Sequence, residues 1–354
     1  MAVLYKCSFM KGALIMKKIA LFVALILALA LCVSLSACGG NNDSAGNNGG
    51  QGGENGGGSN NSEGSGAAAK KPSEGLEFWS NGDGTCYLSN IGTCEDVDIV
   101  IPTQSPEGDK VTSIAEYAFN SCSNIKSVYI PEGITAIPDG TFYWCVSLER
   151  IELPDSIEDV APSAFEYCES LVYNTYDNAK YLGNSRNKYL VLLSATSTDI
   201  TSCNIHPDTK VLAARAFQGC EKLTGLEIPK SITTLSYAVF ANCKGIVNFE
   251  VQSHITSIEG SAFSGCTNLK SVVIPEGVTN IEYGLFYSCV NLESVVIPAR
   301  VTAIPESMFC FCQNLAEVRY GGTMEQWNSL PKGRNWDSAT SSFTIYCSDG
   351  NVSN

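Results

Sequence analysis

The sequence contains little of what catalytic proteins usually need. It holds only two histidines, His206 and His254, in 354 residues, and neither accompanies a nucleophile motif such as Gly-x-Ser-x-Gly. There is no glycine loop that could cradle a phosphate, no dinucleotide fingerprint and no calcium-binding loop. Carboxylates are plentiful, but no spacing singles out a glycosidase pair. We therefore expect no catalytic residues, no cofactor and no enzymatic activity.

Basic side chains are also scarce, with 22 Lys and Arg against 36 Asp and Glu. Nucleic acids and anionic lipid surfaces are bound through clustered Lys and Arg. The charge balance thus argues against both as partners, and it suits a soluble acidic surface.

Cysteine is abundant, at 16 residues, but no Cys-x-x-Cys pair occurs, so no zinc site is expected. Half of the cysteines belong to one motif, Phe-x-x-Cys. The motif repeats every 23 residues, apart from one step of 52 between its third and fourth copies. A period of this length predicts a stack of repeats. The copies are Phe119/Cys122, Phe142/Cys145, Phe165/Cys168, Phe217/Cys220, Phe240/Cys243, Phe263/Cys266, Phe286/Cys289 and Phe309/Cys312.

Each repeat predicts one short strand. In the copy that starts at Cys266, Val272 and Ile274 alternate with exposed positions, and Pro275 ends the pairing. A single repeat cannot cover its own apolar side chains, so neighbouring repeats must bury them. We expect the repeated cysteines to be core thiols, because free Cys packs as a small hydrophobe. For Cys86 and Cys94, nearer the N-terminus, a disulfide and free thiols remain equally open.

The long step and the two ends depart from the repeat. Strands are expected at Asn174–Tyr176 and at Ile200–Ile205, and Lys180–Leu193 between them has two apolar runs around a Gly/Asn/Ser turn, which predicts a β-hairpin. Near the C-terminus, 324–330 is expected to form one or two helical turns and 343–347 a last strand. Atypical ends of this kind are typical of capping units.

Three motifs, Ala-Phe-x-x-Cys, Leu-x-x-Val-x-Ile-Pro and Val-x-x-Ile, resemble the 23-residue leucine-rich repeats of BspA-like bacterial surface proteins, over about residues 76–350. The resemblance implies an α/β-type repeat solenoid: a curved leucine-rich repeat array with a parallel concave sheet, few regular helices, caps at both ends and, here, one inserted β-hairpin. It also implies attachment or recognition at the cell surface. The expected divisions are an N-terminal cap at 76–110, a solenoid at 111–320 with the hairpin at about 177–199, and a C-terminal cap at 321–354.

The N-terminus has the features of an export signal. Lys17 and Lys18 precede an apolar run at 19–33 that is too short to span a membrane, and translation from Met16 would give an ordinary signal. Leu35-Ser36-Ala37-Cys38 resembles the lipobox of bacterial lipoproteins, which implies a signal peptide at 1–37 and acyl chains on Cys38. Residues 38–75 contain a Gly/Asn/Ser stretch that cannot bury a core and is expected to be a disordered tether. The chain is thus expected to be exported and lipid-anchored at the outer face of a bacterial cell membrane.

The best candidates for partner contacts are variable, solvent-facing positions along the strand row. They are Tyr129, Arg150, Glu152, Tyr173, Asn204, Glu227, Asn248, Glu250 and Arg319. Glu227 and Glu250 are on successive repeats and would repel each other slightly, which hints at a polar or basic ligand. Turn packing is expected to explain most of the aromatic residues between each Phe and Cys, namely Tyr143, Trp144, Tyr167, Tyr287 and Phe311.

Two functions follow from these features. The first is a membrane-anchored cell-surface leucine-rich repeat protein for recognition or adhesion, which binds an extracellular protein or glycan on its concave face. The alternative is a structural surface-coat protein that self-associates, without a small ligand and without catalysis.

Overall fold

The computed structural model describes residues 70–354. The expected signal peptide, Cys38 and most of the tether expected at 38–75 lie outside these residues. Within the described part, no helix is long and apolar enough to cross a membrane.

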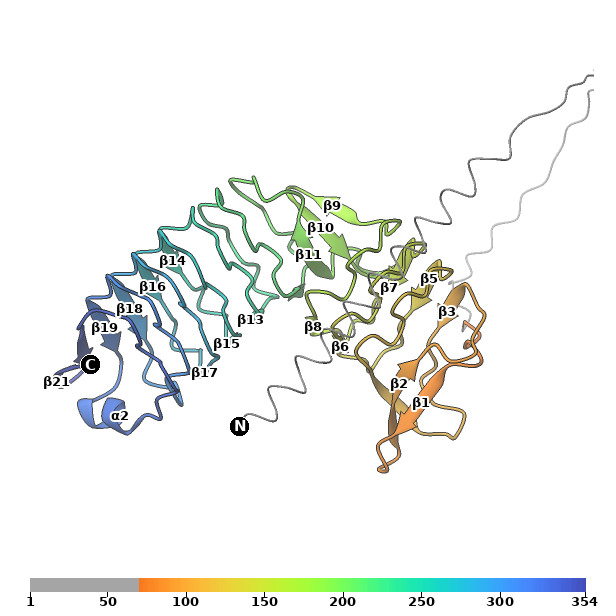
Figure 1. The fold of residues 1–354 in the computed structure, drawn as a ribbon, viewed down its shortest axis with the longest axis horizontal. Coiled ribbons are helices and arrows are strands. Elements are labelled where there is room, and N and C mark those ends of the chain that lie inside the picture. The colour runs from red at the N-terminus through yellow and green to blue at the C-terminus, as the bar shows by residue number, and fades with distance from the viewer. Residues whose placement is uncertain (1–69) are drawn as a thin grey trace, which may run out of the picture. The chain divides into compact units, whose positions relative to one another are not determined.

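Each repeat forms one coil, and the coils stack so that strands of successive coils pair in parallel (Figure 1). Short strands of three or four residues form one row, and strands of two residues form another. The rows follow from the sequence alternation, because buried and exposed side chains alternate along each strand. The longer strands are β3 (Asp98–Val100), β5 (Ser127–Tyr129), β7 (Arg150–Glu152), β14 (Asn248–Glu250), β16 (Ser271–Val273), β18 (Ser294–Ile297) and β19 (Glu317–Tyr320). The two-residue strands are β6 (Ala136–Ile137), β8 (Asp159–Val160), β12 (Val211–Leu212), β13 (Thr234–Leu235), β15 (Ser257–Ile258) and β17 (Asn280–Ile281).

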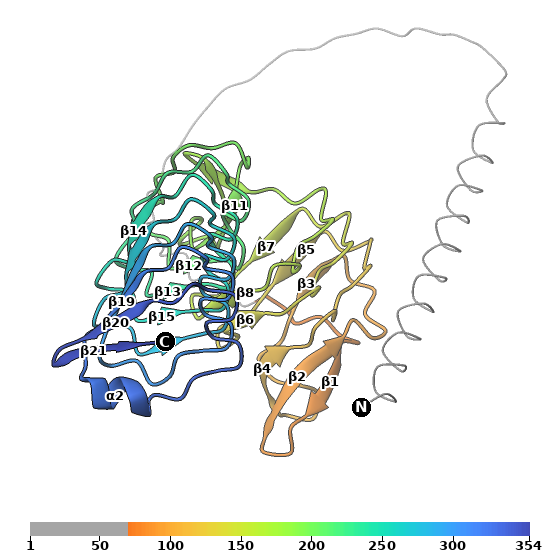
Figure 2. The same cartoon turned by 60° about the vertical axis from the view of Figure 1, so that its left-hand side comes forward.

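The row of longer strands is not continuous. One sheet has the order β3-β5-β7 and a second has β14-β16-β18-β19-β20-β21, and Figure 2 shows them as separate groups. The strand expected at Ile200–Ile205 is absent, so that prediction was wrong, although Ile200, Cys203 and Ile205 are buried as expected. The segment before it provides no parallel strand to pair with. Instead of bonding to a strand carbonyl, the backbone N–H of Asn204 donates to the side-chain carboxylate of Asp177 at 2.6 Å.

The predicted hairpin is confirmed. Its strands β10 (Ala179–Leu182) and β11 (Val191–Ala195) pair antiparallel, with Tyr181 opposite Leu192. On one side β9 (Asn174–Tyr176) pairs antiparallel with β10, and on the other β12 (Val211–Leu212) pairs in parallel with β11. The strand expected at 174–176 is therefore present, but it belongs to the hairpin sheet and does not continue the parallel row.

The hairpin lies between two hydrophobic cores. Tyr181 and Leu192 belong to the core of the later repeats, whereas Leu182 and Val191 belong to the core of the earlier ones. Successive strand residues point to opposite faces, so one hairpin supplies side chains to both cores. We call residues 70–171 the N-terminal block and residues 217–354 the C-terminal block.

The repeated phenylalanines form two stacks. In the N-terminal block the rings of Phe119, Phe142 and Phe165 stack with centroids 5.3 and 5.4 Å apart. In the C-terminal block the stack runs from Phe217 through Phe240, Phe263 and Phe286 to Phe309, with spacings of 5.5 to 6.0 Å. All are buried, so each ring both fills its own coil and contacts the next.

Most of the repeated cysteines form hydrogen bonds from their thiols to the backbone of the preceding repeat. The thiol of Cys145 donates to the carbonyl oxygen of Phe119, in the preceding repeat, at 3.0 Å. The same geometry, at 3.0 to 3.1 Å, recurs for Cys168, Cys243, Cys266, Cys289 and Cys312. Cys122 and Cys220 lack it because each starts a stack and has no Phe-x-x-Cys coil immediately before it; their nearest acceptors are at 4.0 and 3.9 Å. Within each stack, the motif therefore couples every coil after the first to the one before through an S–H···O bond.

The thiols are protonated donors. Burial raises the pKa of Cys145, Cys266 and Cys312 to about 12 and that of Cys168 to about 11. Cys86 and Cys94, the pair left open by the sequence, are both free thiols in this structure.

Both ends differ from the repeats between them. At the N-terminal end, β1 (Glu77–Ser80) and β2 (Thr85–Asn90) pair antiparallel, and β4 (Lys110–Ile114) joins β2 in parallel. At the C-terminal end, β20 (Thr344–Cys347) and β21 (Gly350–Ser353) pair antiparallel. The helical turns expected at 324–330 are α2 (Met324–Ser329), which starts with a capping box between Thr323 and Gln326.

Candidate binding surfaces

Three of the predicted partner residues line one hollow beside β14, at the start of the second sheet, which we call the sheet-face hollow. Glu250 belongs to β14, whereas Asn204 and Glu227 lie in the two coils before it, which form no strand there. Asn204, Glu227 and Glu250, all exposed, contribute to a hollow of about 700 Å³. The two glutamates take part in none of the ion pairs or side-chain hydrogen bonds found within residues 70–354. Their carboxylates are therefore available as hydrogen-bond acceptors.

The same hollow contains two polar atoms that sequence reasoning missed. Gln252 Oε1 and His254 Nε2 are buried, and neither has a hydrogen-bond partner within the described residues. A buried polar atom without a partner costs roughly 1 to 3 kcal/mol. Such atoms call for an explanation, and a bound ligand is one.

A signal for these residues does exist in the sequence. Most repeats have proline directly after the strand, as at Pro131, Pro154, Pro229 and Pro275. Gln252 occupies that position in its own repeat, and His254 follows two residues later. The replacement of proline by Gln252, close to Glu227 and Glu250, is the sequence signal that distinguishes this hollow.

The N-terminal group of predicted residues is partly covered by the chain itself. Lys70 Nζ lies 2.7 Å from Glu152 Oε2 and 4.5 Å from the ring centroid of Tyr129. Ser185, from the hairpin loop, donates to the other carboxylate oxygen of Glu152 at 3.3 Å. The hydrogen bond from Lys70 lowers the pKa of Glu152. Beside these residues, Arg150 borders a second hollow of about 560 Å³.

The other three predicted residues lie apart. Tyr173 is half-buried, with Lys180 Nζ 5.3 Å from its ring centroid. Asn248 accepts a hydrogen bond from Ser271 at 2.8 Å. Arg319 pairs with Glu317, Nε to Oε1 at 3.1 Å, and lies over the ring of Tyr346. The nine predicted residues thus do not form one surface, and only Asn204, Glu227 and Glu250 share the hollow at His254.

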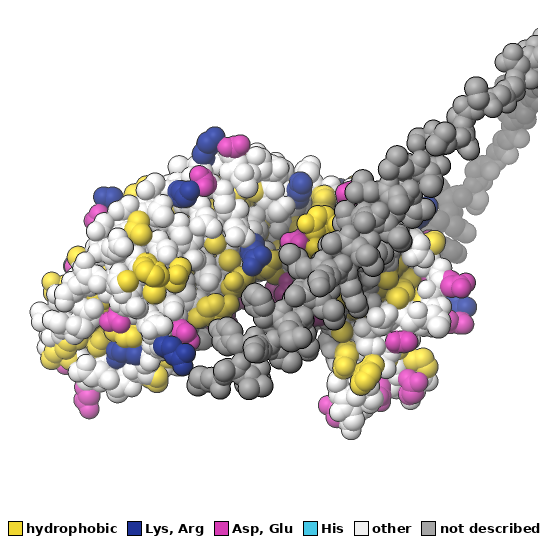
Figure 3. Space-filling view, viewed as in Figure 1, with side chains coloured by type: hydrophobic (Ala, Val, Ile, Leu, Met, Phe, Trp, Pro, Cys, Tyr) yellow, Lys and Arg dark blue, Asp and Glu magenta, His cyan; other side chains and the backbone are white. Residues whose placement is uncertain are grey.

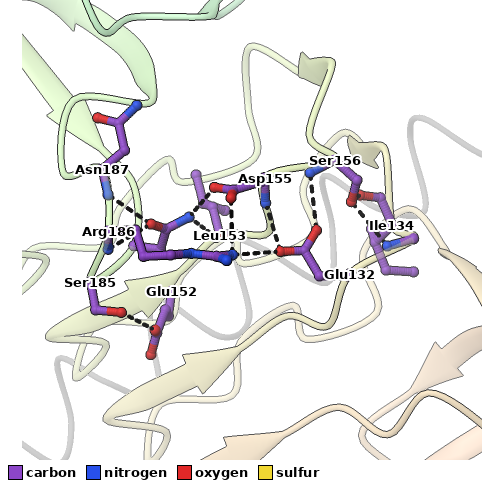
Figure 4. A network of polar contacts seen from close by, with 11 residues as sticks. Glu132, Ile134, Glu152, Leu153, Asp155, Ser156, Ser185, Arg186 and Asn187 are labelled. Atoms are coloured by element: carbon purple, nitrogen blue, oxygen red, sulfur yellow. Dashed lines mark hydrogen bonds and ion pairs between the residues drawn. The ribbon is translucent and has the colours of Figure 1, made fainter. Parts of the chain in front are cut away.

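The hairpin loop is held against the N-terminal block (Figure 4). Asn184 Nδ2 donates to the carbonyl oxygen of Leu153 at 3.0 Å and to Asp155 at 2.8 Å. Arg186 reaches Glu132 at 3.1 Å and Asp155 at 2.9 Å. The loop at the break in the repeat is therefore a structural joint, and its polar side chains are engaged within the chain.

Comparison with protein families matches these coils to the BspA type leucine rich repeat region, with six copies over residues 98–187 and 194–316. The chain belongs to this family. The gap between the two matched stretches falls at the hairpin, where the coil geometry is interrupted. Membership in the BspA-type repeat family indicates a role in protein interaction or adhesion.

Several solved structures are similar to this BspA-type chain. A leucine-rich repeat protein from Bacteroides ovatus is 21% identical, with 74% of this chain and 75% of that chain covered and a TM-score of 0.32. The leucine-rich repeat protein of T. pallidum is 21% identical over 70% of this chain and 90% of that one, with a TM-score of 0.29. A leucine-rich cell surface protein from Faecalibacterium prausnitzii is 21% identical over 75% and 99%, with a TM-score of 0.34. No curated protein matches the chain.

Proposed function

We propose that this BspA-type chain is an adhesion or recognition protein of the cell surface, and that it binds a protein or glycan partner at the sheet-face hollow lined by Asn204, Glu227, Glu250, Gln252 and His254. The observation that carries the proposal is the pair of buried, unpartnered atoms in this hollow, Gln252 Oε1 and His254 Nε2. Together with two unpaired carboxylates, they favour a partner that offers several hydrogen-bond donors, such as hydroxyl or amino groups.

A screen of the purified chain against glycan and protein arrays tests this proposal. The Glu227→Ala/Glu250→Ala variant is expected to bind any captured partner about tenfold more weakly or worse, since hydrogen bonds to charged groups contribute about 1.5 to 3 kcal/mol each. Glu276→Ala/Glu325→Ala serves as the control, because it removes the same charge from exposed positions outside the hollow. Equal loss in both variants would point to bulk charge and would contradict a site here. Concentration-dependent assembly without any partner would favour the surface-coat alternative.

We further propose that the protein is exported and held at the membrane by lipid on Cys38, with the tether at 38–75 joining this anchor to the repeats. For the rest of the chain we propose an N-terminal cap at 76–110, a solenoid at 111–320 and a C-terminal cap at 321–354. The support is the lipobox-like Leu35-Ser36-Ala37-Cys38 after a short apolar run. Metabolic labelling with a radioactive fatty acid should label the chain and should fail for Cys38→Ala. Labelling of that variant would contradict the anchor without affecting the proposed hollow.

A further inference from the structure

Two exposed aromatic side chains of the N-terminal block stack on each other, and a third, half-buried one packs beside them. Trp144 and Tyr167 are 47% and 50% exposed, and their ring centroids lie 4.8 Å apart at an interplanar angle of 24°. Tyr143 packs edge-on against Tyr167 at 5.2 Å. We call Tyr143, Trp144 and Tyr167 the aromatic cluster. Turn packing was expected to explain most of the aromatic residues between each Phe and Cys, but Trp144 and Tyr167 remain about half exposed.

The backbone does not favour aromatic residues at these positions. The residue two after each repeated Phe has a positive φ, between 59° and 75°, from Ser121 to Phe311. Most repeats place a small or polar residue there, among them Gly219, Asn242, Gly265 and Ser288. Bulky side chains are disfavoured in this left-handed region. Trp144 and Tyr167 occupy it without being buried, so the scaffold alone gives no reason for them.

The cluster also lies in an acidic part of the molecule. Residues 72–171 contain 18 acidic and 3 basic side chains, whereas the equally long segment 248–347 contains 9 and 5. On the face shown in Figure 3, the N-terminal end is mostly acidic, and the C-terminal half is mixed. Close to the rings, exposed Glu166 precedes Tyr167, and Tyr143 and Glu166 both raise the pKa of Tyr167.

No Lys or Arg of residues 70–354 lies over the rings of the cluster. Elsewhere in residues 70–354, five aromatic rings have a Lys or Arg placed over them, among them Tyr129, Tyr237 and Trp327. None of these five cations lies over Tyr143, Trp144 or Tyr167. The described part of the chain therefore uses cation–π contacts repeatedly, but supplies none to the cluster, which lies in the acidic N-terminal block.

We propose that the aromatic cluster is a docking surface for a basic protein segment that bears arginine side chains. A guanidinium group stacks on the faces of Trp and Tyr and pairs with carboxylates at the same time. Trp, Tyr and Arg are also the residues that dominate the energetics of protein interfaces. The surface shares no residue with the sheet-face hollow, so this inference does not rest on the proposed function.

The test is titration of the full chain with a synthetic peptide of alternating arginine and glycine, followed by Trp fluorescence or calorimetry. Trp144→Asn and Tyr167→Asn are the informative variants, because Asn242 already occupies the equivalent position with a φ of 61° and the fold accepts it. Each is expected to weaken binding about tenfold, the size of a partly desolvated cation–π contact. A peptide with lysine in place of arginine should bind more weakly.

Phe311→Asn is the matched control. Phe311 has the same backbone position and is 40% exposed, but lies in the less acidic segment 248–347, with 9 acidic and 5 basic side chains. It should leave peptide binding unchanged. None of these Asn variants alters the net charge, so equal binding by wild type and Trp144→Asn would mean that bulk charge alone attracts the peptide, and would overturn the proposal. Cluster-dependent capture of uncharged glycans, or self-association through the cluster, would overturn it as well.

Discussion

The two blocks are built from the same repeat, yet they differ in the parts that the repeat does not constrain. The N-terminal block stacks three phenylalanine rings and the C-terminal block stacks five. The buried positions are alike in both, whereas the exposed positions give one block an acidic surface with an aromatic cluster and the other the hollow at His254. Fold and recognition are thus encoded in separate positions of each 23-residue unit.

The largest expected effect comes from removing one ring from the middle of each stack. Phe142→Ala and Phe263→Ala should each cost about 3 to 5 kcal/mol of unfolding free energy, because each leaves a cavity between two rings. Since the two blocks have separate cores, hydrogen exchange should accelerate around β5–β8 in the first variant and around β14–β17 in the second. Equal acceleration across both blocks in either variant would show that the cores unfold as one unit.

Alkaline pH should weaken the C-terminal block more than the N-terminal block. Cys243, Cys266, Cys289 and Cys312 donate S–H···O bonds in the former, and only Cys145 and Cys168 do so in the latter. Burial raises the pKa of these thiols above 9.0, the value of a cysteine exposed to water as in the unfolded chain. The folded state therefore keeps protons that the unfolded state loses, and stability is full below pH 9 and falls as pH rises toward about 12.

At pH 10 each of these thiols should lower the free energy of unfolding by about 1 kcal/mol. Region-resolved hydrogen exchange, corrected for the intrinsic pH dependence of exchange, measures it. Cys266→Ala should reduce the pH slope of the C-terminal block. Cys310→Ala should reduce it less, because burial also raises the pKa of Cys310 but its thiol donates to no Phe carbonyl of residues 70–354. An unchanged slope in Cys266→Ala would assign the alkaline effect to other groups.

The joint between the blocks gives a smaller effect. Asn184→Ala removes the two hydrogen bonds to Leu153 and Asp155 and two more that Asn184 Oδ1 accepts within the loop, and should destabilise the hairpin by about 1 to 3 kcal/mol. Arg186→Ala removes exposed ion pairs and should cost less than about 1 kcal/mol. Thermal melts of both variants measure the difference. If Arg186→Ala destabilised the protein more than Asn184→Ala, the ion pairs of Arg186, and not the hydrogen bonds of Asn184, would hold the loop.

The periodic part of this molecule was predictable because its causes are local and repeated. Phe142 and Val272 stand for buried positions that recur from copy to copy, and Pro275 for a position that is proline in most copies, so spacing alone places the coils and the buried rows. The break was only half predictable: the hairpin follows from the turn residues around Gly183, but the missing strand at Ile200–Ile205 follows from Asp177, whose carboxylate replaces a strand partner. That contact is long-range and leaves no periodic signal.

The candidate sites were harder to predict for the same reason. Glu227 and Glu250 could be assigned to one face from the repeat alone, but Lys70 reaching across to Tyr129 and Glu152 depends on where the segment before the first coil runs. Exposure of Trp144 likewise depends on its backbone conformation. The repeat gives the position of that residue, not the direction in which the ring points.

The smallest expected effect bears most directly on the comparison of the blocks. Trp144→Asn should change unfolding free energy by less than about 1 kcal/mol, because relief of the left-handed backbone offsets the lost ring contacts. The reciprocal Asn242→Trp, at the same position of the C-terminal block, should destabilise by about 1 kcal/mol. It places a bulky side chain in the left-handed region, and the equivalent position of the next repeat is Gly265, which offers no ring to stack on. Chemical denaturation measures both. If Trp144→Asn instead cost as much as Phe142→Ala, the aromatic cluster would be part of the scaffold, and its exposure would need another explanation than binding.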